Sequence, residues 1–266
     1  MQKKSLRCSG AFPDPKLRIA ADADVVVFCT RLPSDAELGL ASTMTAALPL
    51  PRTPMIGRYV INEMLIPKKH GPQLWEALGG TELNDYVEFM NWPIISSESQ
   101  FVGHLNQMTK SGGKRSLIDR LLSRPATSDI YAIVRDGRAL GIRAYRSIDL
   151  THRTVESGRV IKSRSLAGTL ASLESTYLAM VRAFDECGFR RWESETSAEN
   201  IAARRSMEKS GLTLEGIARS ARQVDGRDCD LARYAITADD WPTAKAAMER
   251  KLYQGPAMDS PALAEH

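Results

Sequence analysis

The sequence predicts an α/β fold, and three features of its second half carry that prediction. Residues 154–161 alternate as a strand does and are rich in β-branched side chains. A turn of small residues around Gly168 follows, and leucine and aromatic side chains then recur at helical spacing as far as Phe184. Hairpin patterns lie before and after this strand–turn–helix unit.

Composition limits the class of protein further. The chain has 266 residues, 43% of them hydrophobic, which suits one large domain, or one domain with long arms, around a substantial core. A net charge of +4 fits an enzyme for an anionic cofactor as readily as a weak nucleic-acid binder. The four cysteines are scattered without a C-x-x-C pair, so we expect no zinc or disulfide framework and a reducing cytoplasm. The apolar run Val25–Cys29 is too short for a membrane span.

The chain divides into an extension, a domain and a tail. Residues 1–54 are expected to be a partly ordered N-terminal extension, 55–252 the domain, and 253–266 a disordered tail. Asp136-Gly137 is a strong hairpin turn between two strand patterns. The elements expected up to this hairpin are a strand at 58–66, helices at 70–78, 83–90, 97–108 and 117–122, and strands at 130–135 and 139–148.

Turn and cap signals divide the rest of the domain. Gly188 ends the long helix, and Thr196-x-x-Glu199 is a capping box that predicts the start of the next one. Gly211 ends that helix, and Trp241-Pro242 begins the last. The remaining expected elements are strands at 191–195, 212–223 and 231–237 and helices at 196–210 and 241–252.

The turn before the long helix has the outline of a phosphate cradle. Backbone N–H groups at a helix start lack intrahelical partners, and the helix dipole there favours negative charge. The alternative is that water alone satisfies these groups, as at any strand–loop–helix junction. The turn by itself leaves both interpretations open.

Several short phrases resemble one family when they are taken in order. They are Leu140-Gly141-Ile142, Val155–Gly158, Phe184–Arg191, Asn200 with Glu208–Leu212, Glu215–Arg219 and Gly226–Asp230. Residues 131–241 thereby resemble the Gcn5-related N-acetyltransferase (GNAT) superfamily, in its RimJ/RimL-like branch. A fainter likeness at 65–78 extends the resemblance to roughly 57–241, and its shared order is more specific than any single phrase.

The resemblance implies a GNAT fold, a mixed but mostly antiparallel sheet of six to seven strands with helices on both faces. A V-shaped split between the strands at 154–161 and 191–195 would hold acetyl-CoA as co-substrate, with no metal. The strand backbone would pair with the pantetheine arm, the turn amides would hold the pyrophosphate, and Asn200 would face the pantetheine and the thioester. The implied cofactor-binding residues are Val160, Ile161, Lys162, Ala167, Gly168, Thr169, Leu170, Ala171, Ser172, Asn200 and Arg204. Four basic residues either meet the nucleotide phosphates or are solvated surface charges, namely Lys162, Arg164, Arg204 and Arg205.

The sequence departs from the superfamily pattern at several positions. The turn usually reads Gln/Arg-x-x-Gly-x-Gly/Ala, and this chain has Ala167, Leu170 and Ser172 there. Leu170 lacks the conformational freedom of glycine. Ala203 follows Asn200 where relatives often have serine, and Met207 replaces a tyrosine that protonates the leaving thiolate in many members.

The candidate catalytic residues are Glu156, Asn200 and Ser206. Acetyl transfer requires an uncharged amine, so a base near the split is needed. Glu156 is the first candidate, and its alternative role is that of a solvent-facing or ion-paired strand residue. Glu193 and Glu195 share one face of the neighbouring strand and could serve instead. Ser206 could meet the thiolate, and a backbone N–H near Val160 could bind the oxyanion.

The helical arm before the hairpin is where acceptor substrates enter in this fold. His70 and His104 lie there, and they are either ordinary helix-surface residues or acceptor contacts. Trp75 and Trp92 either line an acceptor pocket or pack in the core. A further set, Arg219, Arg222 and Arg227, either attracts an acidic acceptor or forms a solvated edge.

The leading hypothesis is an acetyl-CoA-dependent N-acetyltransferase that acts on a small amine or amino-acid-like acceptor by direct attack on the thioester. The alternative is a GNAT-fold protein that binds CoA or another ligand with little or no catalysis. A nucleic-acid partner is not favoured, because the arginines are not interleaved with aromatic residues. No membrane partner is expected. The protein is expected to be a cytoplasmic monomer or homodimer.

Overall fold

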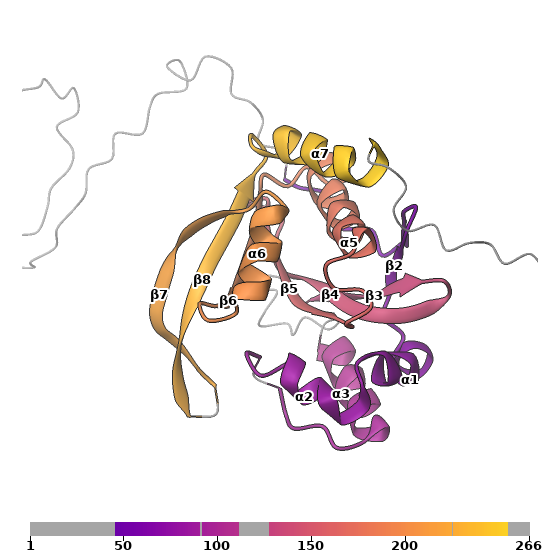
Figure 1. Cartoon of the computed structure of the whole chain (residues 1–266). Helices are drawn as coiled ribbons and strands as arrows, with labels where there is room; N and C mark the ends of the chain where they lie inside the picture. Colours follow the sequence, from indigo (N-terminus) through magenta and orange to yellow (C-terminus); the bar gives the residue numbers. More distant parts are fainter. Residues whose placement is uncertain (1–45, 91, 112–127, 225, 255–266) are drawn as a thin grey trace, which may run out of the picture. The chain divides into compact units, whose positions relative to one another are not determined.

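One open sheet forms the centre of the molecule in the computed structural model, which describes residues 46–90, 92–111, 128–224 and 226–254 (Figure 1). It has eight strands in the order β1-β2-β3-β4-β5-β6-β8-β7. Every neighbouring pair is antiparallel except β5 and β6, which run parallel. The strands are β1 (Met55–Ile56), β2 (Ile61–Met64), β3 (Asp129–Arg135), β4 (Arg138–Asp149), β5 (Thr154–Lys162), β6 (Arg191–Ser197), β7 (Thr213–Val224) and β8 (Arg227–Thr237).

The strand count exceeds the predicted six to seven by the short strand β1. Two residues are too few to show the alternation by which strands are found in a sequence. β2 is also shorter than the predicted 58–66. Its predicted first residues form a turn instead, because the buried carboxylate of Glu174 accepts hydrogen bonds from the N–H groups of Arg58, Tyr59 and Val60 at 2.8, 2.6 and 3.0 Å.

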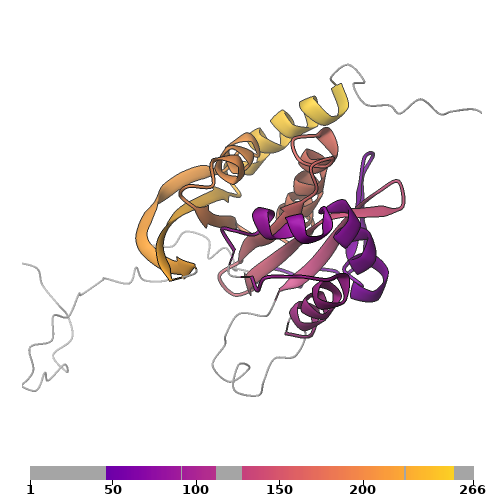
Figure 2. The ribbon, with the colours of Figure 1, turned by 60° about the horizontal axis from the view of Figure 1, so that its bottom comes forward.

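Helices cover both faces of the sheet, as predicted (Figure 2). Figure 1 shows α5 and α7 on one side and α1, α2 and α3 on the other. The buried apolar residues form a main core cluster under α5 and α7 and a second one under α1 and α3. No helix in the described part of the chain is long and apolar enough to cross a membrane. The helices are α1 (Pro67–Ala77), the 3₁₀-helix Gly80–Glu82, α2 (Leu83–Tyr86), α3 (Glu98–Ser111), α5 (Leu170–Val181), α6 (Ile201–Lys209) and α7 (Trp241–Glu249).

Two predicted helices differ from those observed, and a third cannot be compared. The pattern at 83–90 gives only the four residues of α2, and the predicted helix at 117–122 lies outside the described residues. The capping-box prediction was wrong, because Thr196 still belongs to β6 and pairs with Ala232. Asn200 caps α6 instead, where its Oδ1 accepts a hydrogen bond from the N–H of Ala203 at 3.0 Å.

Both α5 and α7 continue as a turn of π-helix. α5 passes into Arg182–Glu186 and reaches Gly188, whose φ of 71° is the left-handed conformation expected after a helix end. α7 passes into Arg250–Gln254. The predicted helices, which end near 187 and 252, therefore each comprise an α-helix and the π-helical turn that follows it.

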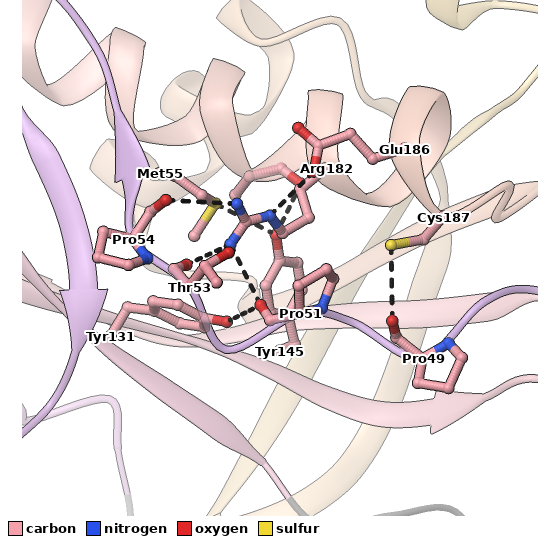
Figure 3. Close-up of polar contacts among 11 residues, drawn as sticks. Pro49, Pro51, Thr53, Pro54, Met55, Tyr131, Tyr145, Arg182, Glu186 and Cys187 are labelled. Atoms are coloured by element: carbon pink, nitrogen blue, oxygen red, sulfur yellow. Dashed lines mark hydrogen bonds and ion pairs between the residues drawn. The ribbon is translucent and has the colours of Figure 1, made fainter.

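Residues 47–55 form a strap that lies along the α5 side of the domain (Figure 3). The strap includes three prolines, and Arg182 binds the carbonyl groups around them. Its guanidinium donates to the carbonyl oxygens of Pro51, Thr53 and Pro54 and also pairs with Glu186 at 3.2 Å. The buried side chains of the strap join the main core cluster, namely Ala47, Leu50 and Met55.

Candidate active site

The sheet opens into a split between β5 and β6. Their parallel pairing begins at Thr154 and Arg191 and ends at Ser157 and Ser194. There the Ser194 hydroxyl donates a hydrogen bond to the Ser157 carbonyl oxygen at 3.0 Å and so closes the apex of the split. Beyond this point β5 pairs only with β4 and β6 only with β8. The V-shaped split implied by the resemblance is therefore present.

The free edge of β5 lies beyond a bulge. Arg159 has a φ of 51°, and the register with β4 shifts at the same place. The N–H of Ser163 bonds to the Leu140 carbonyl oxygen on β4 at 2.8 Å. Because successive residues of a strand direct their backbone groups to opposite edges, those of Lys162 and Val160 face the split. Ile161 contributes backbone only, since its side chain is buried in the second core cluster.

The turn that leads into α5 offers fewer free amides than its sequence predicted. The N–H of Ala167 bonds to the Ser163 carbonyl at 2.9 Å, and that of Thr169 bonds to the Leu166 carbonyl at 3.3 Å. Thr169 is the N-cap, and its Oγ1 accepts a hydrogen bond from the N–H of Ser172 at 3.2 Å. Between Ala167 and Ser172, three N–H groups keep no acceptor within the described residues, and they belong to Gly168, Leu170 and Ala171.

The backbone of this turn explains why leucine is tolerated where the family has glycine. Leu170 is the first residue of α5 and has no positive φ, so it needs no special freedom. Gly168 has a φ of 77°, which favours glycine, and no atom lies within 4 Å of where its Cβ would be. Open space and a left-handed backbone therefore coincide at Gly168.

Two cations without a carboxylate partner lie on the α5 face of β4 and β5. Arg143 is 3% exposed, and its Nη1 donates to Ser175 Oγ on α5 at 3.1 Å. Lys162 pairs in register with Gly141, two residues from Arg143, and makes no hydrogen bond or ion pair within the described residues. Burial, with a smaller effect from the Arg143 charge, lowers the pKa of Lys162 to about 8. An anion nearby would stabilise both groups.

Of the other predicted phosphate ligands, two have partners elsewhere and one is exposed. Arg204 donates from Nε to the Tyr234 hydroxyl at 3.1 Å and from Nη1 to the Ala198 carbonyl at 3.0 Å. The hydrogen bond to Tyr234, foremost, holds the pKa of Arg204 above its usual value. Arg164 forms an exposed ion pair with Glu82 at 3.7 Å. Arg205 is exposed on α6.

α6 carries the two remaining predicted residues and the substituted tyrosine position. Asn200 uses its Oδ1 as the helix cap, which leaves its side-chain N–H groups free of any partner in the described chain. Ser206 is exposed, and Met207 packs against the main core cluster. Met207 therefore has a packing role here.

Glu156 lies on the opposite face of the sheet, near the apex of the split. Its Oε1 is 3.1 Å from Arg146 Nη1, and its Oε2 accepts a hydrogen bond from Ser147 Oγ at 2.8 Å. The predicted alternative of an ion pair is therefore observed. The side chain keeps 13% exposure, although its Oε1 is enclosed and accepts no hydrogen bond within the described residues.

The other candidate bases have stronger partners. Glu193 pairs in register with Glu156 and binds Arg191. Arg191 also binds Glu215, and these two carboxylates raise its pKa above the usual range. Glu195 forms an ion pair with Arg222 on β7. Arg222 is therefore not one of a row of solvated arginines along the β7–β8 hairpin.

The helical arm contains one structural and one incompletely bonded histidine. His70 is fully buried, which corrects the expectation of a surface residue, and both of its ring nitrogens are hydrogen-bonded. His104 on α3 contacts the Trp92 ring with a centroid distance of 4.5 Å. Trp75 packs against Phe101 in the second core cluster.

Sequence reasoning missed Arg146, Arg159 and Ser194. No spacing rule identifies them, because their roles depend on the register of β4, β5 and β6. Only Ser194 had a weak signal, since it faces Ser157 once the two strands are aligned in parallel.

The structure is similar to solved acetyltransferases, although no protein-family model and no curated protein matches the sequence. A GCN5-related N-acetyltransferase from Brucella melitensis is 28% identical with a TM-score of 0.70, over 82% of this chain and 92% of that one. A probable GNAT-family acetyltransferase from Chromobacterium violaceum is 23% identical with a TM-score of 0.66, over 82% of this chain and 100% of that one. The ribosomal L7/L12 acetyltransferase RimL, solved with coenzyme A, is 16% identical with a TM-score of 0.55, over 73% of this chain and 99% of that one.

A sheet split beside a helix start that offers free amides defines an acyltransferase of the acetyl-CoA-dependent class. Together with the likeness to the Brucella enzyme, it identifies this chain as a member of the GNAT superfamily. RimL has the same fold.

Proposed function

We propose that this chain is an N-acetyltransferase in which an amine attacks the thioester of acetyl-CoA directly. The observation that carries the proposal is the combination of a free β5 edge with three free amides at the start of α5. An extended pantetheine arm fits the edge as an added strand does, and a diphosphate fits the amides. Lys162 and Arg143 support an anion on the same side of the sheet.

The chain's own residues account for the proton transfers. An acceptor ammonium group gives one proton to Glu156, directly or through a water, and the nitrogen then attacks the thioester carbon. The C–N bond forms and the C–S bond breaks, so sulfur leaves as a thiolate and takes up a proton. The nitrogen passes its second proton through water to replace the one that the thiolate takes up, and no covalent bond to the enzyme forms. The N–H of Val160 faces the split and stabilises charge on the carbonyl oxygen.

We infer that the acceptor is a small amine or an amino-acid-like compound, and that the enzyme acts in the cytoplasm as a monomer or homodimer. Cys187 and Cys229, the cysteines in the described residues, are both free thiols, which suits a reducing compartment.

A second candidate is a protein that binds CoA without efficient catalysis. Met207 favours it, because a thioether cannot protonate a leaving thiolate and Ser206 beside it faces solvent. In the catalytic proposal, Ser206 or a water supplies that proton.

Calorimetric titration with acetyl-CoA tests the proposed cofactor site. Gly168→Glu places a negative charge among the three free amides, so we expect it to abolish micromolar binding. Gly188→Glu is a matched control at the other end of the same helix. Both glycines have positive φ, 77° and 71°, and open space around the missing Cβ, so the backbone strain is comparable. Equal binding by both variants would contradict the site.

Turnover then separates the two candidates. The parent protein is incubated with acetyl-CoA and a panel of amines, and the released thiol is measured. Acetyl-CoA binding together with thiol release and N-acetylated product supports the enzyme. Binding without product from any amine supports the second candidate.

A further inference from the structure

Two arginines lie beside Glu156, and only one of them has a partner. Arg146 forms the ion pair with Glu156 described above. Arg159, at the bulge of β5, makes no hydrogen bond or ion pair within the described residues. It is half-buried, and burial with the charge of Arg146 lowers its pKa below the usual range. A partly buried guanidinium without an acceptor is unfavourable unless a ligand supplies one.

The backbone at Arg159 points to a role beyond packing. Its φ of 51° is uncommon for a residue with a long side chain. Such strain is concentrated at binding and catalytic sites. The bulge also turns this side chain toward Arg146, Glu156 and the α3 residue His104, the charged or titratable groups with which it interacts.

His104 is the second incompletely bonded group in this region. Its Nε2 has no accessible surface and no hydrogen-bond partner within the described residues. Burial, and then the charge of Arg159, lower the pKa of the ring, so the imidazole is neutral at pH 7. A buried ring nitrogen without a hydrogen-bond partner is unfavourable. Trp92 holds the ring in place from one side.

The apex of the split therefore has acidic groups at one end and a cation at the other. Acidic groups, Glu156 and Glu193, lie in register on neighbouring strands at one end. The unpaired cation of Arg159 lies three residues farther along β5, with His104 above it on α3. An amine held at Glu156 could place an anionic group against Arg159.

We propose that Arg159 and His104 bind a carboxylate of the acceptor, so that the acceptor is an amine that also carries an acidic group. This inference rests on the proposed acetyltransferase function and specifies its substrate class. Arg159 supplies a charge-assisted hydrogen bond. His104, in the tautomer with a proton on Nε2, supplies a second donor that is otherwise unused. Because Nε2 is enclosed in the ligand-free chain, the ring has to turn toward the carboxylate when the acceptor binds.

Matched acceptor pairs test the inference. Each amino acid of a panel is compared with its carboxamide, which keeps the amine and removes the negative charge. We expect the parent enzyme to prefer the carboxylate by about 10–100-fold in kcat/KM, on the scale of one charge-assisted hydrogen bond. Arg159→Asn removes the charge with a side chain that tolerates positive φ. It is expected to raise KM for carboxylates by about 10–100-fold and to change the carboxamide values less than about threefold.

Two further variants guard against a merely structural effect. Arg159→Lys keeps the charge and should recover part of the carboxylate preference. Arg138→Gln removes an exposed arginine on β4 that pairs with Glu76, so it should leave the preference unchanged. His104→Phe, which keeps a ring beside Trp92, should reduce the preference in the same direction as Arg159→Asn.

The inference is overturned if the parent uses both members of each pair equally, or if Arg159→Asn lowers both equally while melting unchanged. Its failure differs from failure of the proposed function. If acetyl-CoA binds but no amine is acetylated, calorimetry of the same pairs against the parent and Arg159→Asn still decides whether Arg159 selects a carboxylate. If acetyl-CoA does not bind, the proposed function fails, and the same titration still decides the anion site.

Discussion

Two histidines of the helical arm have opposite environments. His70 on α1 accepts a hydrogen bond from the N–H of Ile66 at Nδ1 and bonds to Glu63 through Nε2 at 2.8 Å. His104 on α3 has an enclosed Nε2 with no partner in the described chain. The first histidine completes a local network, and the second leaves a hydrogen bond unused. The difference indicates which buried groups stabilise the fold and which are available to a ligand.

The same contrast separates two glutamates. The carboxylate of Glu174 is fully buried and accepts three backbone hydrogen bonds and one from the Tyr253 hydroxyl. Glu156 has an ion pair with Arg146 and one hydrogen bond from Ser147, and its enclosed Oε1 accepts no hydrogen bond within the described residues. Glu174 on α5 and His70 on α1 thus have complete sets of partners on opposite sides of the sheet, whereas Glu156 and His104 each keep an enclosed atom without a hydrogen-bond partner within the described residues.

The largest expected effect concerns the carboxylate of Glu156. Glu156→Gln should lower kcat by about 10²–10⁴-fold, because general base catalysis contributes a factor of this size. Acetyl-CoA affinity, measured by calorimetry, should stay within about threefold of the parent value. Glu193→Gln is the matched control. A loss of kcat in Glu193→Gln but not in Glu156→Gln would identify Glu193 as the base instead, and an equal loss in both would contradict a distinct role for Glu156.

The histidines themselves provide the next test. His70→Ala leaves the Ile66 N–H and the Glu63 carboxylate without their partner, so we expect a loss of about 2–4 kcal/mol in the free energy of unfolding. His104→Ala should lose less than about 1 kcal/mol, because it also removes an unsatisfied nitrogen. Urea unfolding measures both. A larger loss for His104→Ala would remove the distinction between the two residues.

Lys162 tests whether an incompletely bonded cation destabilises the apoprotein. Its pKa of about 8 lies below the value of 10.5 for a free lysine, so between these pH values the unfolded chain holds more protons. Stability should therefore rise with pH from about 8 to 10, by at most about 3 kcal/mol from this residue.

Lys162→Met removes this contribution. The variant should be more stable than the parent at pH 7.5, and the difference should shrink at pH 9.5, as measured by urea unfolding of the ligand-free proteins. The same dependence on pH in parent and variant would show that Lys162 has an ordinary pKa.

The smallest effect concerns a completely bonded group inside the cofactor site. Thr169→Ala removes the cap of α5 and should cost about 1 kcal/mol of stability. A shift in the melting temperature measures it. Because the proposed ligand amides remain, acetyl-CoA affinity should change little, and Thr169→Ser should restore the stability. A loss of affinity that serine does not restore would count against this assignment.

Much of the fold could be predicted from local sequence. The Asp136-Gly137 turn is an example, since both residues have positive φ, 50° and 74°, as a two-residue hairpin requires. The capping box failed because Thr196 has a tertiary alternative, the pairing with β8, that the local pattern does not contain. β1 was missed because it is held by the strap and β2 and not by its own two side chains.

The site could be predicted only in part. The split and the helix start followed from the order of elements and the resemblance, and Glu156 followed from its place on β5. The number of free amides depends on hydrogen bonds made by Ser163 and Leu166 carbonyls, which no sequence rule supplies. Arg159 and His104 are free to bind a ligand because β4, β5 and α3 offer them no hydrogen-bond acceptor or donor in the folded chain. The sequence alone does not show this.

The contacts of Arg182 with the strap have a consequence for the order of folding. They join residues 128 to 131 positions apart, and the thiol of Cys187 reaches the Pro49 carbonyl across 138. Closing so long a loop has a large entropic cost, so the strap is expected to dock after β3, β4 and α5 have assembled. Weakening the arginine should then accelerate unfolding far more than it slows folding. The strap is thereby expected to slow the unfolding of a domain whose topology forms before the strap docks.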